Sequence, residues 1–201
     1  MKTIILSLLC LALFFAGTPS EKTYQIGDAV NDFTLKNIDG KMITLSAYAD
    51  KGAIVIFDCN TCPYSKAYLE RIKALDAKYA SKGYPVIAIT PNDPDRSPDD
   101  SFEKMVSYGK EHNYKHAYLQ DVDQTVARAF GATNTPHVFI LKKDDGKLVV
   151  NYIGAIDNNT RDAKAADKKY VESAVDQLLK GEKVEVNETK AIGCTIKWKA
   201  A

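Results

Sequence analysis

The residues with the clearest chemical potential are two cysteines, Cys59 and Cys62, which are separated by two residues and followed directly by Pro63. A Cys-x-x-Cys pair can bind a metal, close a structural disulfide, or exchange electrons with other thiols. A structural zinc site needs two further ligands at suitable spacing. The chain offers no clear second pair, because only His112 and His116 are closely spaced and we expect a helix to end between them. The pattern therefore favours redox chemistry without a metal or an organic cofactor.

The position of the pair between two predicted elements supports this interpretation. The apolar run at 52–58 predicts a strand buried on both faces, and helical spacing of apolar residues runs from Pro63 to about residue 80. A thiol attacks a disulfide only as the thiolate, which the unpaired N–H groups of a helix N-terminus stabilise. We expect Cys59 to be the exposed attacking thiol at or just before this N-terminus. Cys62 is expected in the first turn, partly shielded, as the resolving thiol.

A second chemical feature is the dipeptide Thr135-Pro136, which precedes a predicted strand at 137–143. A cis proline at a strand entrance would leave the backbone of the preceding residue unpaired and free to bind an extended peptide. An ordinary turn proline is the alternative.

The rest of the chain alternates strand and helix patterns around these features. Asp39-Gly40 marks a hairpin within 33–45, and Asp144-Asp145-Gly146 marks a second one. Strands are also predicted at 84–90, 116–119, 137–143 and 147–154, and helices at 63–80, 100–112, 124–130 (capped by Asp123) and 162–180. The proline- and aspartate-rich segment 91–100 is expected to be a solvated loop. This order predicts an α/β fold with helices on both faces of a central sheet and the cysteine pair at the carboxyl end of a strand.

The termini divide the chain into three segments. Lys2, the mainly apolar residues 4–16 and the small residues up to Ser20 form the pattern of a secretory signal peptide, whose removal would also remove Cys10. An uncleaved membrane anchor is the alternative. We therefore expect a signal peptide at 1–20, a domain at 21–180 and a C-terminal tail at 181–201. The mature protein is expected to be periplasmic or otherwise extracytoplasmic, with no membrane segment, and the net charge of +1 gives no reason to expect nucleic-acid binding.

Signal cleavage would leave an odd number of cysteines, because Cys194 lies in the tail. In the interpretation we prefer, Cys194 packs as a small apolar residue with Ile192, Ile196 and Trp198. In the alternative, it is a possible third redox thiol that the tail delivers to Cys59 and Cys62.

Several segments in a fixed order resemble one known family. Residues 59–63 (CNTCP), Thr135-Pro136 and the segments GDAVNDFTLKNIDGK, AITPND, FGATNTPHVFIL and ETKAIGCTIKWK resemble the thioredoxin superfamily, and more narrowly its redoxin branch of peroxiredoxin-like, AhpC/TSA-type proteins. The resemblance covers nearly all of the chain beyond residue 20. It implies a thioredoxin-like fold, with a central mixed sheet flanked by helices, an N-terminal β-hairpin and a redoxin-type insertion.

The resemblance also implies an activity and its residues. The expected activity is thiol–disulfide exchange with protein or low-molecular-weight thiols and disulfides, through a redox-active Cys59–Cys62 disulfide. Cys59 would be the attacking thiol, Cys62 the resolving thiol, and Pro136 a cis proline that faces the pair. The residues expected to contact substrate are Thr135, Asn60 and Thr61.

Two departures from related patterns affect this assignment. Ala53 stands where thioredoxin has a buried acid, so Asp58 is the candidate for that role, although a carboxylate beside Cys59 also opposes thiolate formation. A thiol-dependent peroxidase is the main alternative activity. When Cys62 is matched to a peroxidatic cysteine, however, Val55 and Cys59 replace the proline and threonine of a peroxiredoxin site, which favours disulfide exchange.

A copper-binding, metallochaperone-like function is a further alternative, because His137 follows Pro136 and could lie near the cysteines. A packed histidine explains that position equally well, and copper chaperones usually space their cysteines more widely.

Overall fold

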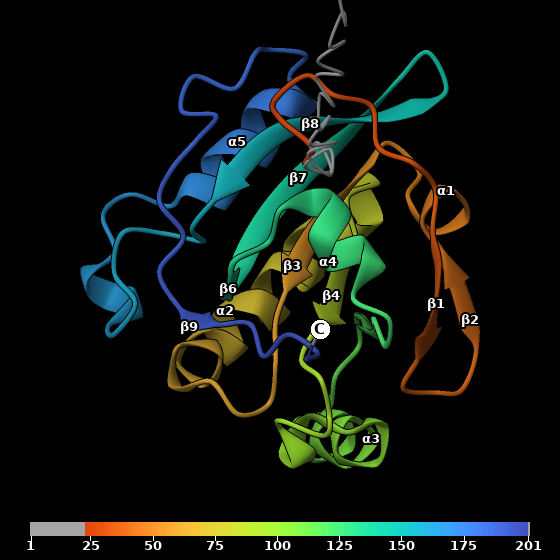
Figure 1. Cartoon of the computed structure of the whole chain (residues 1–201). Coiled ribbons are helices and arrows are strands. Elements are labelled where there is room, and N and C mark those ends of the chain that lie inside the picture. The colour runs from red at the N-terminus through yellow and green to blue at the C-terminus, as the bar shows by residue number, and fades with distance from the viewer. Residues whose placement is uncertain (1–22, 201) are drawn as a thin grey trace, which may run out of the picture.

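The strand that leads into the cysteine pair, β3 (Gly52–Phe57), lies near the centre of a mixed sheet. In the computed structural model, which describes residues 23–200, β3 pairs in parallel with β4 (Val86–Thr90) and antiparallel with β7 (His137–Asp144). The other strands are β1 (Thr34–Asn37), β2 (Met42–Thr44), β5 (Ala117–Gln120) and β8 (Lys147–Gly154). The seven strands follow the order β2-β1-β5-β4-β3-β7-β8 (Figure 1).

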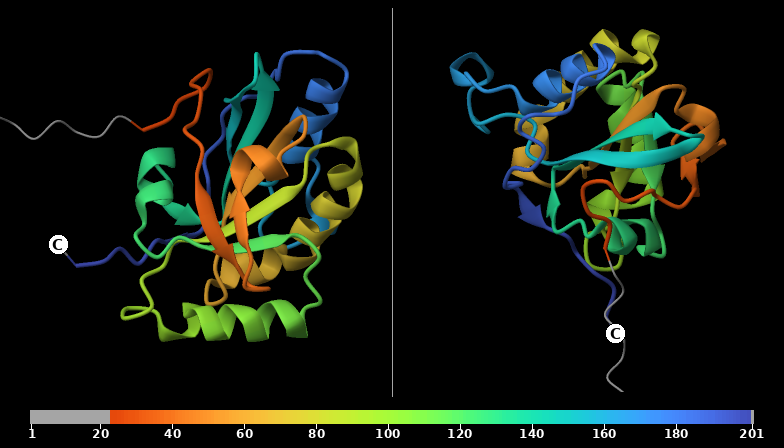
Figure 2. Two further views of the ribbon diagram at one scale, coloured as in Figure 1. Left: turned by 90° about the vertical axis from the view of Figure 1, so that its right-hand side faces the viewer. Right: turned by 90° about the horizontal axis from the view of Figure 1, so that it is seen from above.

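Helices cover both faces of this sheet because its central strands are apolar on both sides. On one face, Ile54 and Ile56 belong to a cluster with α2 (Pro63–Tyr79) and α5 (Tyr170–Leu179). On the other face, Val55 and Phe57 pack with α1 (Leu45–Tyr48) and α4 (Thr125–Phe130). Figure 2 shows α4 on the opposite side of the sheet from α2 and α5. A smaller cluster joins Met105 of α3 (Phe102–Glu111) to β4 and β5.

Three segments meet at one edge of the sheet. β3 and β4 are parallel, so the chain leaves both strands at this edge and enters the loops 58–62 and 91–101. β7 runs the other way and begins opposite the end of β3, where Phe57 pairs with His137. Thr135-Pro136, directly before β7, is therefore brought to the cysteine loop although it is far away in the sequence.

Most of the predicted elements are confirmed. Both hairpins, the strands and the helices at 63–80, 100–112 and 124–130 are present within a few residues of the expected bounds. The last helix was predicted too long: α5 begins at Tyr170, and 162–169 holds only a 3₁₀ turn, Ala163–Ala165. Two hydrogen bonds between Asn158 and Lys168 hold this segment in place. The Lys168 N–H donates to Asn158 Oδ1, and the Asn158 N–H donates to the Lys168 carbonyl.

The predicted cap of the helix at 124–130 is also wrong. Asp123 does not cap α4; instead, Asp121 accepts hydrogen bonds from the N–H groups of Val126 and Ala127, at 3.5 and 2.8 Å. Gln124 precedes the helix in a left-handed conformation, with φ of 59°. This geometry turns the chain so that the carboxyl group of Asp121, three residues earlier, reaches the helix N-terminus.

The tail beyond α5 returns along the molecule and adds a short strand. Thr189 N–H donates to the carbonyl of Ile153, which ties the tail to β8 at 2.9 Å. Further on, β9 (Cys194–Thr195) pairs antiparallel with β6 (Asn134–Thr135), directly before Pro136. Figure 1 shows β9 beside β6.

The predicted signal peptide and Cys10 lie outside the described residues. Within 23–200, no helix combines the length and the apolar character needed to cross a membrane.

Candidate active site

Cys62, not Cys59, occupies the N-terminus of α2. Cys62 is the N-cap residue and Pro63 is the first helical residue, as its missing N–H allows. Cys59 lies three residues earlier in the loop. Both side chains are buried, each only 2% exposed. The expectation of an exposed Cys59 at the helix N-terminus is therefore wrong, because the loop folds inward against the segment after β4.

Asp100 holds this loop in place. Its carboxyl group is fully buried and accepts hydrogen bonds from the backbone N–H groups of Asn60 and Thr61, at 2.8 and 3.2 Å, and from the Thr61 hydroxyl at 2.8 Å. Asn92 and Ser97 donate to its second oxygen, at 2.8 and 2.7 Å. The segment 91–100 is thus not the solvated loop that its composition suggested, since several of its polar side chains turn inward to this carboxyl group.

The side chain of Asn60 is engaged within the protein, and its expected contact with substrate stays a prediction. Its side chain is 5% exposed. The amide donates to the carbonyl of Asp99 at 2.9 Å, and its oxygen accepts from the buried hydroxyl of Tyr118 at 2.8 Å. Both polar atoms are therefore engaged within the protein. Thr61 is only partly buried and lies at the rim of a groove that also contains Lys66 and Lys104.

Thr135 contacts both cysteines of the pair. Its hydroxyl oxygen lies 3.2 Å from Cys59 Sγ, and its carbonyl oxygen accepts a hydrogen bond from Cys62 Sγ at 3.0 Å. The peptide bond between Thr135 and Pro136 is cis, as expected. The backbone edge of Thr135 is not open, however: Cys194 of β9 pairs with it.

Cys194 is the third sulfur of the site. It lies opposite Thr135, whose carbonyl accepts a hydrogen bond from Cys62 Sγ at 3.0 Å, and this places Cys194 next to Cys62. Ile192 is 49% exposed, so it provides no buried apolar surface for Cys194. The position of Cys194 opposite Thr135 favours the alternative of a third redox thiol over the apolar packing that we preferred. All three cysteines within 23–200 are free thiols.

The surroundings favour a thiolate at Cys62 and a thiol at Cys59. The pKa of Cys62 is lowered to about 4, and the largest cause is that the Cys59 thiol donates to its sulfur. Burial raises this pKa, whereas Cys194 and the backbone N–H of Ser65 act as further donors and lower it. The Thr135 carbonyl accepts from the Cys62 thiol and so opposes its ionisation, but the several donors around Cys62 outweigh this one acceptor. The pKa of Cys59 is raised by its hydrogen bond to Cys62, by burial and by the carboxyl groups of Asp100 and Asp58.

Asp58 is the buried acid of the site. It is 4% exposed, and burial raises its pKa to about 7, with the charges of Cys62 and Asp100 acting in the same direction. Its Oδ1 has no hydrogen-bond partner among the described residues. Asp58 can therefore gain or lose a proton near neutral pH beside the cysteine pair.

His137 does not join the sulfurs. Its side chain packs against Phe139, with 4.7 Å between ring centroids, and its Nδ1 accepts a hydrogen bond of 3.4 Å from the Thr133 N–H. Across residues 23–200, no group of three or more His, Cys, Asp or Glu side chains has the arrangement of a metal site. These positions give the copper-binding alternative no support.

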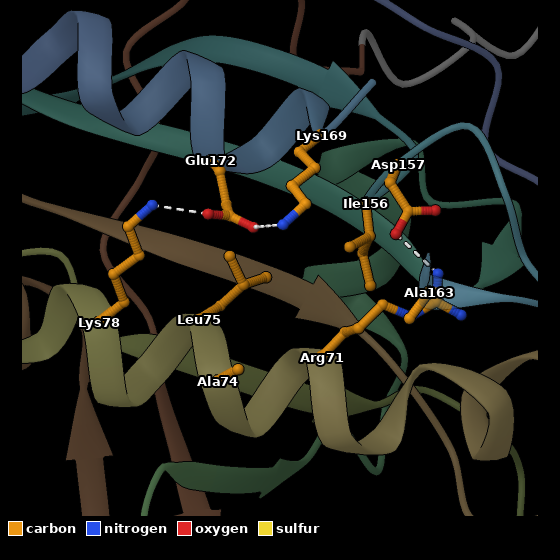
Figure 3. A pocket seen from close by; sticks show the side chains of 9 residues that line it. All are labelled: Arg71, Ala74, Leu75, Lys78, Ile156, Asp157, Ala163, Lys169 and Glu172. Carbon is orange, nitrogen blue, oxygen red and sulfur yellow. Dashed lines mark hydrogen bonds and ion pairs between the residues drawn. The ribbon is translucent and has the colours of Figure 1, made fainter. Parts of the chain in front are cut away.

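A separate pocket lies between α2 and α5 (Figure 3). Its charged side chains pair with one another: Arg71 with Asp157 at 2.7 Å, and Glu172 with both Lys78 and Lys169, at 2.6 and 3.5 Å. Arg71 is nine residues into the helix from Cys62, or about 14 Å along its axis. The charged side chains of this pocket are paired with one another, and the pocket is not part of the thiol site.

The sequence could indicate the thiols but not the groups that hold them. Cys59, Cys62 and Pro136 were found from their spacing, and the structure brings them together with Thr135 and Cys194. Asp100 was missed, because nothing in the local pattern distinguishes it from the exposed Asp99. Its loop partners, Asn60 and Thr61, are about forty residues away.

Comparisons with known proteins identify a family and proteins of similar structure. The sequence model described as the AhpC/TSA family matches residues 26–151. The thiol-disulfide oxidoreductase ResA of Bacillus thuringiensis is 24% identical over 74% of this chain and 83% of its own length. An uncharacterised conserved protein from Geobacillus kaustophilus has a similar crystal structure, with a TM-score of 0.81 and 32% identity over 92% of this chain and 99% of that chain.

The fold is thioredoxin-like. The exposed lipoprotein thioredoxin Etrx1 of Streptococcus pneumoniae superposes with a TM-score of 0.55 at 23% identity, over 75% of this chain and 99% of that chain. The central mixed sheet flanked by helices and the N-terminal hairpin match the predicted architecture.

Proposed function

The chain belongs to the AhpC/TSA family, and on this premise we propose that it is a thiol–disulfide oxidoreductase whose active pair is Cys59 and Cys62. The observation that carries the proposal is that both thiols meet at Thr135, 3.2 Å from Cys59 Sγ to the hydroxyl and 3.0 Å from Cys62 Sγ to the carbonyl, with Cys62 at the N-cap of α2, where helix N–H groups stabilise a thiolate. A thiolate stabilised in this way is the nucleophile that disulfide exchange requires. The similarity to ResA supports the same activity.

The chemistry is a two-electron exchange that needs no further cofactor. In the reduced protein, Cys62 is the thiolate and Cys59 is its hydrogen-bonding thiol. Oxidation by a substrate disulfide joins the two sulfurs, releases two substrate thiols and leaves a Cys59–Cys62 disulfide. Because Cys62 has the lowered pKa, we assign to it the nucleophilic role that the sequence pattern assigned to Cys59. Asp58, with its pKa near neutrality, is placed to accept the proton that Cys59 loses.

The test is to equilibrate the protein in buffers of reduced and oxidised glutathione, block free thiols by alkylation, and map the cysteine pairs by mass spectrometry. A Cys59–Cys62 disulfide should form and disappear cooperatively with the ratio of the two glutathione forms. Absence of this disulfide at every ratio would show that the pair is not the redox centre.

A hydrogen peroxide assay separates exchange from peroxidase activity. Cys62, the position matched to a peroxidatic cysteine, has the lowered pKa, but Cys59 stands where a peroxiredoxin site has the threonine whose hydroxyl would orient the peroxide. We therefore expect slow peroxide turnover compared with glutathione exchange. Peroxide consumption faster than disulfide exchange would favour the peroxidase function instead.

We also propose that the protein acts outside the cytoplasm. The support is the signal-peptide pattern of residues 1–20, together with the similarity to a protein described as an exposed lipoprotein thioredoxin. N-terminal sequencing of the protein isolated from cell fractions tests this proposal. The expected result is a mature N-terminus near residue 21 in an extracytoplasmic fraction, and an intact Met1 in the cytoplasmic fraction contradicts it.

A further inference from the structure

The C-terminal strand occupies the backbone edge where a substrate peptide was expected. β9 pairs antiparallel with β6, and Cys194 is the residue opposite Thr135. An extended peptide that paired with Thr135 would first have to displace β9. Substrates that reach the thiols without strand pairing therefore have the advantage.

The tail is held in this position by specific contacts on both sides of Cys194. Asn134 donates its side-chain amide to the carbonyl of Gly193 at 3.1 Å, and the backbone N–H of Lys197 donates to Asn92 Oδ1 at 2.9 Å. A Cβ atom at position 193 would overlap with the carbonyl oxygen of Thr135. Glycine is therefore required for the approach that brings Cys194 to the pair.

Cys194 is also the most accessible of the three sulfur-bearing residues. Cys59 and Cys62 are each 2% exposed, whereas Cys194 is only partly buried. It lies opposite Thr135, whose carbonyl accepts a hydrogen bond from Cys62 Sγ at 3.0 Å. Cys194 is thus placed between the buried pair and the solvent.

We propose that Cys194 is a third redox-active thiol, through which low-molecular-weight disulfides exchange with the buried pair. This inference rests on the proposed function. Burial and the neighbouring Cys62 raise the pKa of Cys194 to about 11, so Cys194 attacks only from the minor state in which its proton has passed to the Cys62 sulfur. The thiolate of Cys194 then attacks the external disulfide and forms a mixed disulfide while one substrate thiolate leaves. Cys62, deprotonated again, attacks Cys194 Sγ, releases the second substrate thiolate and forms a Cys62–Cys194 disulfide. Cys59 then attacks Cys62 Sγ as a thiolate, which yields Cys59–Cys62 and frees Cys194.

The sum of these steps conserves electrons: the protein loses two, and the external disulfide becomes two thiols. The proton that Cys62 received from Cys194 goes to the first departing thiolate, and Cys59 passes its own proton to Cys194 as that sulfur leaves, so Cys194 ends as it began. In the reverse direction, an external thiolate attacks Cys194 Sγ of the Cys62–Cys194 disulfide. The sulfur that leaves is then Cys62, whose low pKa makes it the better leaving group.

The first experiment measures the rate at which oxidised glutathione oxidises the reduced protein. Cys194→Ser should slow the reaction by about tenfold or more, because the substrate then has to reach a buried sulfur. Thr195→Ser, a change at the neighbouring exposed position of β9, is the matched control and should stay within about twofold of the wild-type rate. An unchanged rate for Cys194→Ser overturns the inference.

A second variant prevents β9 from packing against Thr135 but keeps all three thiols of the site. Gly193→Val should slow the exchange to a similar extent as Cys194→Ser, because its side chain cannot fit against the Thr135 carbonyl. Circular dichroism verifies that the variant is folded. A folded Gly193→Val protein that exchanges at the wild-type rate contradicts the inference.

The third experiment traps the intermediate. Cys59→Ser cannot complete the last step, so oxidised glutathione should convert it to a Cys62–Cys194 disulfide that peptide mapping detects. Finding only glutathione adducts on this variant overturns the inference. The proposed function has its own separate readout, because it fails if the wild-type protein never forms Cys59–Cys62.

Discussion

At the scale of single residues, the geometry of the thiol site depends on one carboxyl group. Asp100 Oδ1 accepts from the N–H groups of Asn60 and Thr61, and its Oδ2 accepts from the hydroxyls of Thr61 and Ser97 and from the Asn92 amide. All of these partners are donors. An asparagine in place of Asp100 could not satisfy all of these donors. In either orientation of its amide, the NH₂ group would replace one of the two oxygens and face groups that also donate.

Asp100→Asn is therefore expected to destabilise the protein by about 3 kcal/mol, since at least two buried donors lose their acceptor. Asp99→Asn is the control: the Asp99 side chain is 76% exposed, and its replacement should have little effect. Urea denaturation of the two variants in the reduced state measures the difference. Equal stabilities would show that Asp100 does not hold the loop.

A pH titration tests the ionisation of Cys62. The reduced protein should retain one thiolate down to a midpoint near pH 4, visible in its ultraviolet absorbance, and Cys62→Ser should lose this transition. The pKa of Cys62 is lower in the folded protein than in an unfolded chain, where it is about 9. Its ionisation therefore stabilises the fold above about pH 9, and the contribution falls as the pH decreases from there toward 4.

Cys194→Ser refines the same measurement. The C–O bond of serine is shorter than the C–S bond of cysteine, so the hydroxyl reaches less far and its hydrogen bond to Cys62 is weaker. The midpoint pH of the Cys62 titration should therefore rise. A thiolate that titrates only near pH 9 in the wild-type protein would contradict the assignment of Cys62 as the nucleophile.

At the scale of elements, the packing of α2 depends on an ion pair next to the pocket in Figure 3. Asp157 is buried and accepts from Arg71 at 2.7 Å and from the hydroxyl of Tyr68 at 2.9 Å. Asp157→Ala should destabilise the protein by about 3 kcal/mol, because it leaves a largely buried charge without its partner. Thermal unfolding measures the loss.

Glu70→Ala is the matched control for that variant. Glu70 pairs with Lys73 on the same helix, but its side chain is 77% exposed, so the change should cost less than about 0.5 kcal/mol. Similar losses in the two variants would mean that the pair with Asp157 contributes no more than a surface ion pair.

The elements that the sequence predicted well are those whose pattern is local. The continuous apolar run of β3 and the helical spacing of α2 come from contacts with the layers directly above and below, and each shows its period within one window. The segment 162–169 has a helical composition, but its backbone is held by Asn158, a residue outside that window. Side-chain to backbone bonds of this kind leave no periodic signal.

At the scale of the whole molecule, the tail was the least predictable part. Residues 181–200 have no period because they contact several different elements in turn, first β8, then β6, and then the loop after β4. The sequence could therefore show that the expected signal cleavage leaves Cys194 as an odd cysteine beside the Cys59–Cys62 pair. It could not show that the tail places this cysteine beside Cys62.

The contact with β8 fixes where the tail begins its return toward the site. Thr189 Oγ1 accepts from the backbone N–H of Ala155 at 2.9 Å and shares a 2.6 Å hydrogen bond with the hydroxyl of Tyr152. The tail also passes so close that a Cβ atom at Gly154 would overlap with Thr189. Thr189 is therefore an anchor point for the tail, five residues before Cys194.

Thr189→Val keeps the shape of the side chain but removes its hydroxyl, so the Ala155 N–H loses its acceptor, while the Tyr152 hydroxyl keeps its hydrogen bond to the Ala155 carbonyl at 2.6 Å. We expect a loss of about 2 kcal/mol in the free energy of unfolding. Because the anchor lies upstream of β9, the amides of Cys194 and Thr195 should also exchange their hydrogens faster with solvent. Thr195→Val, at an exposed position, is the control and should leave the stability nearly unchanged. If Thr189→Val lowers stability but leaves exchange in β9 as slow as in the wild type, the contacts after Gly193 hold the tail without help from β8.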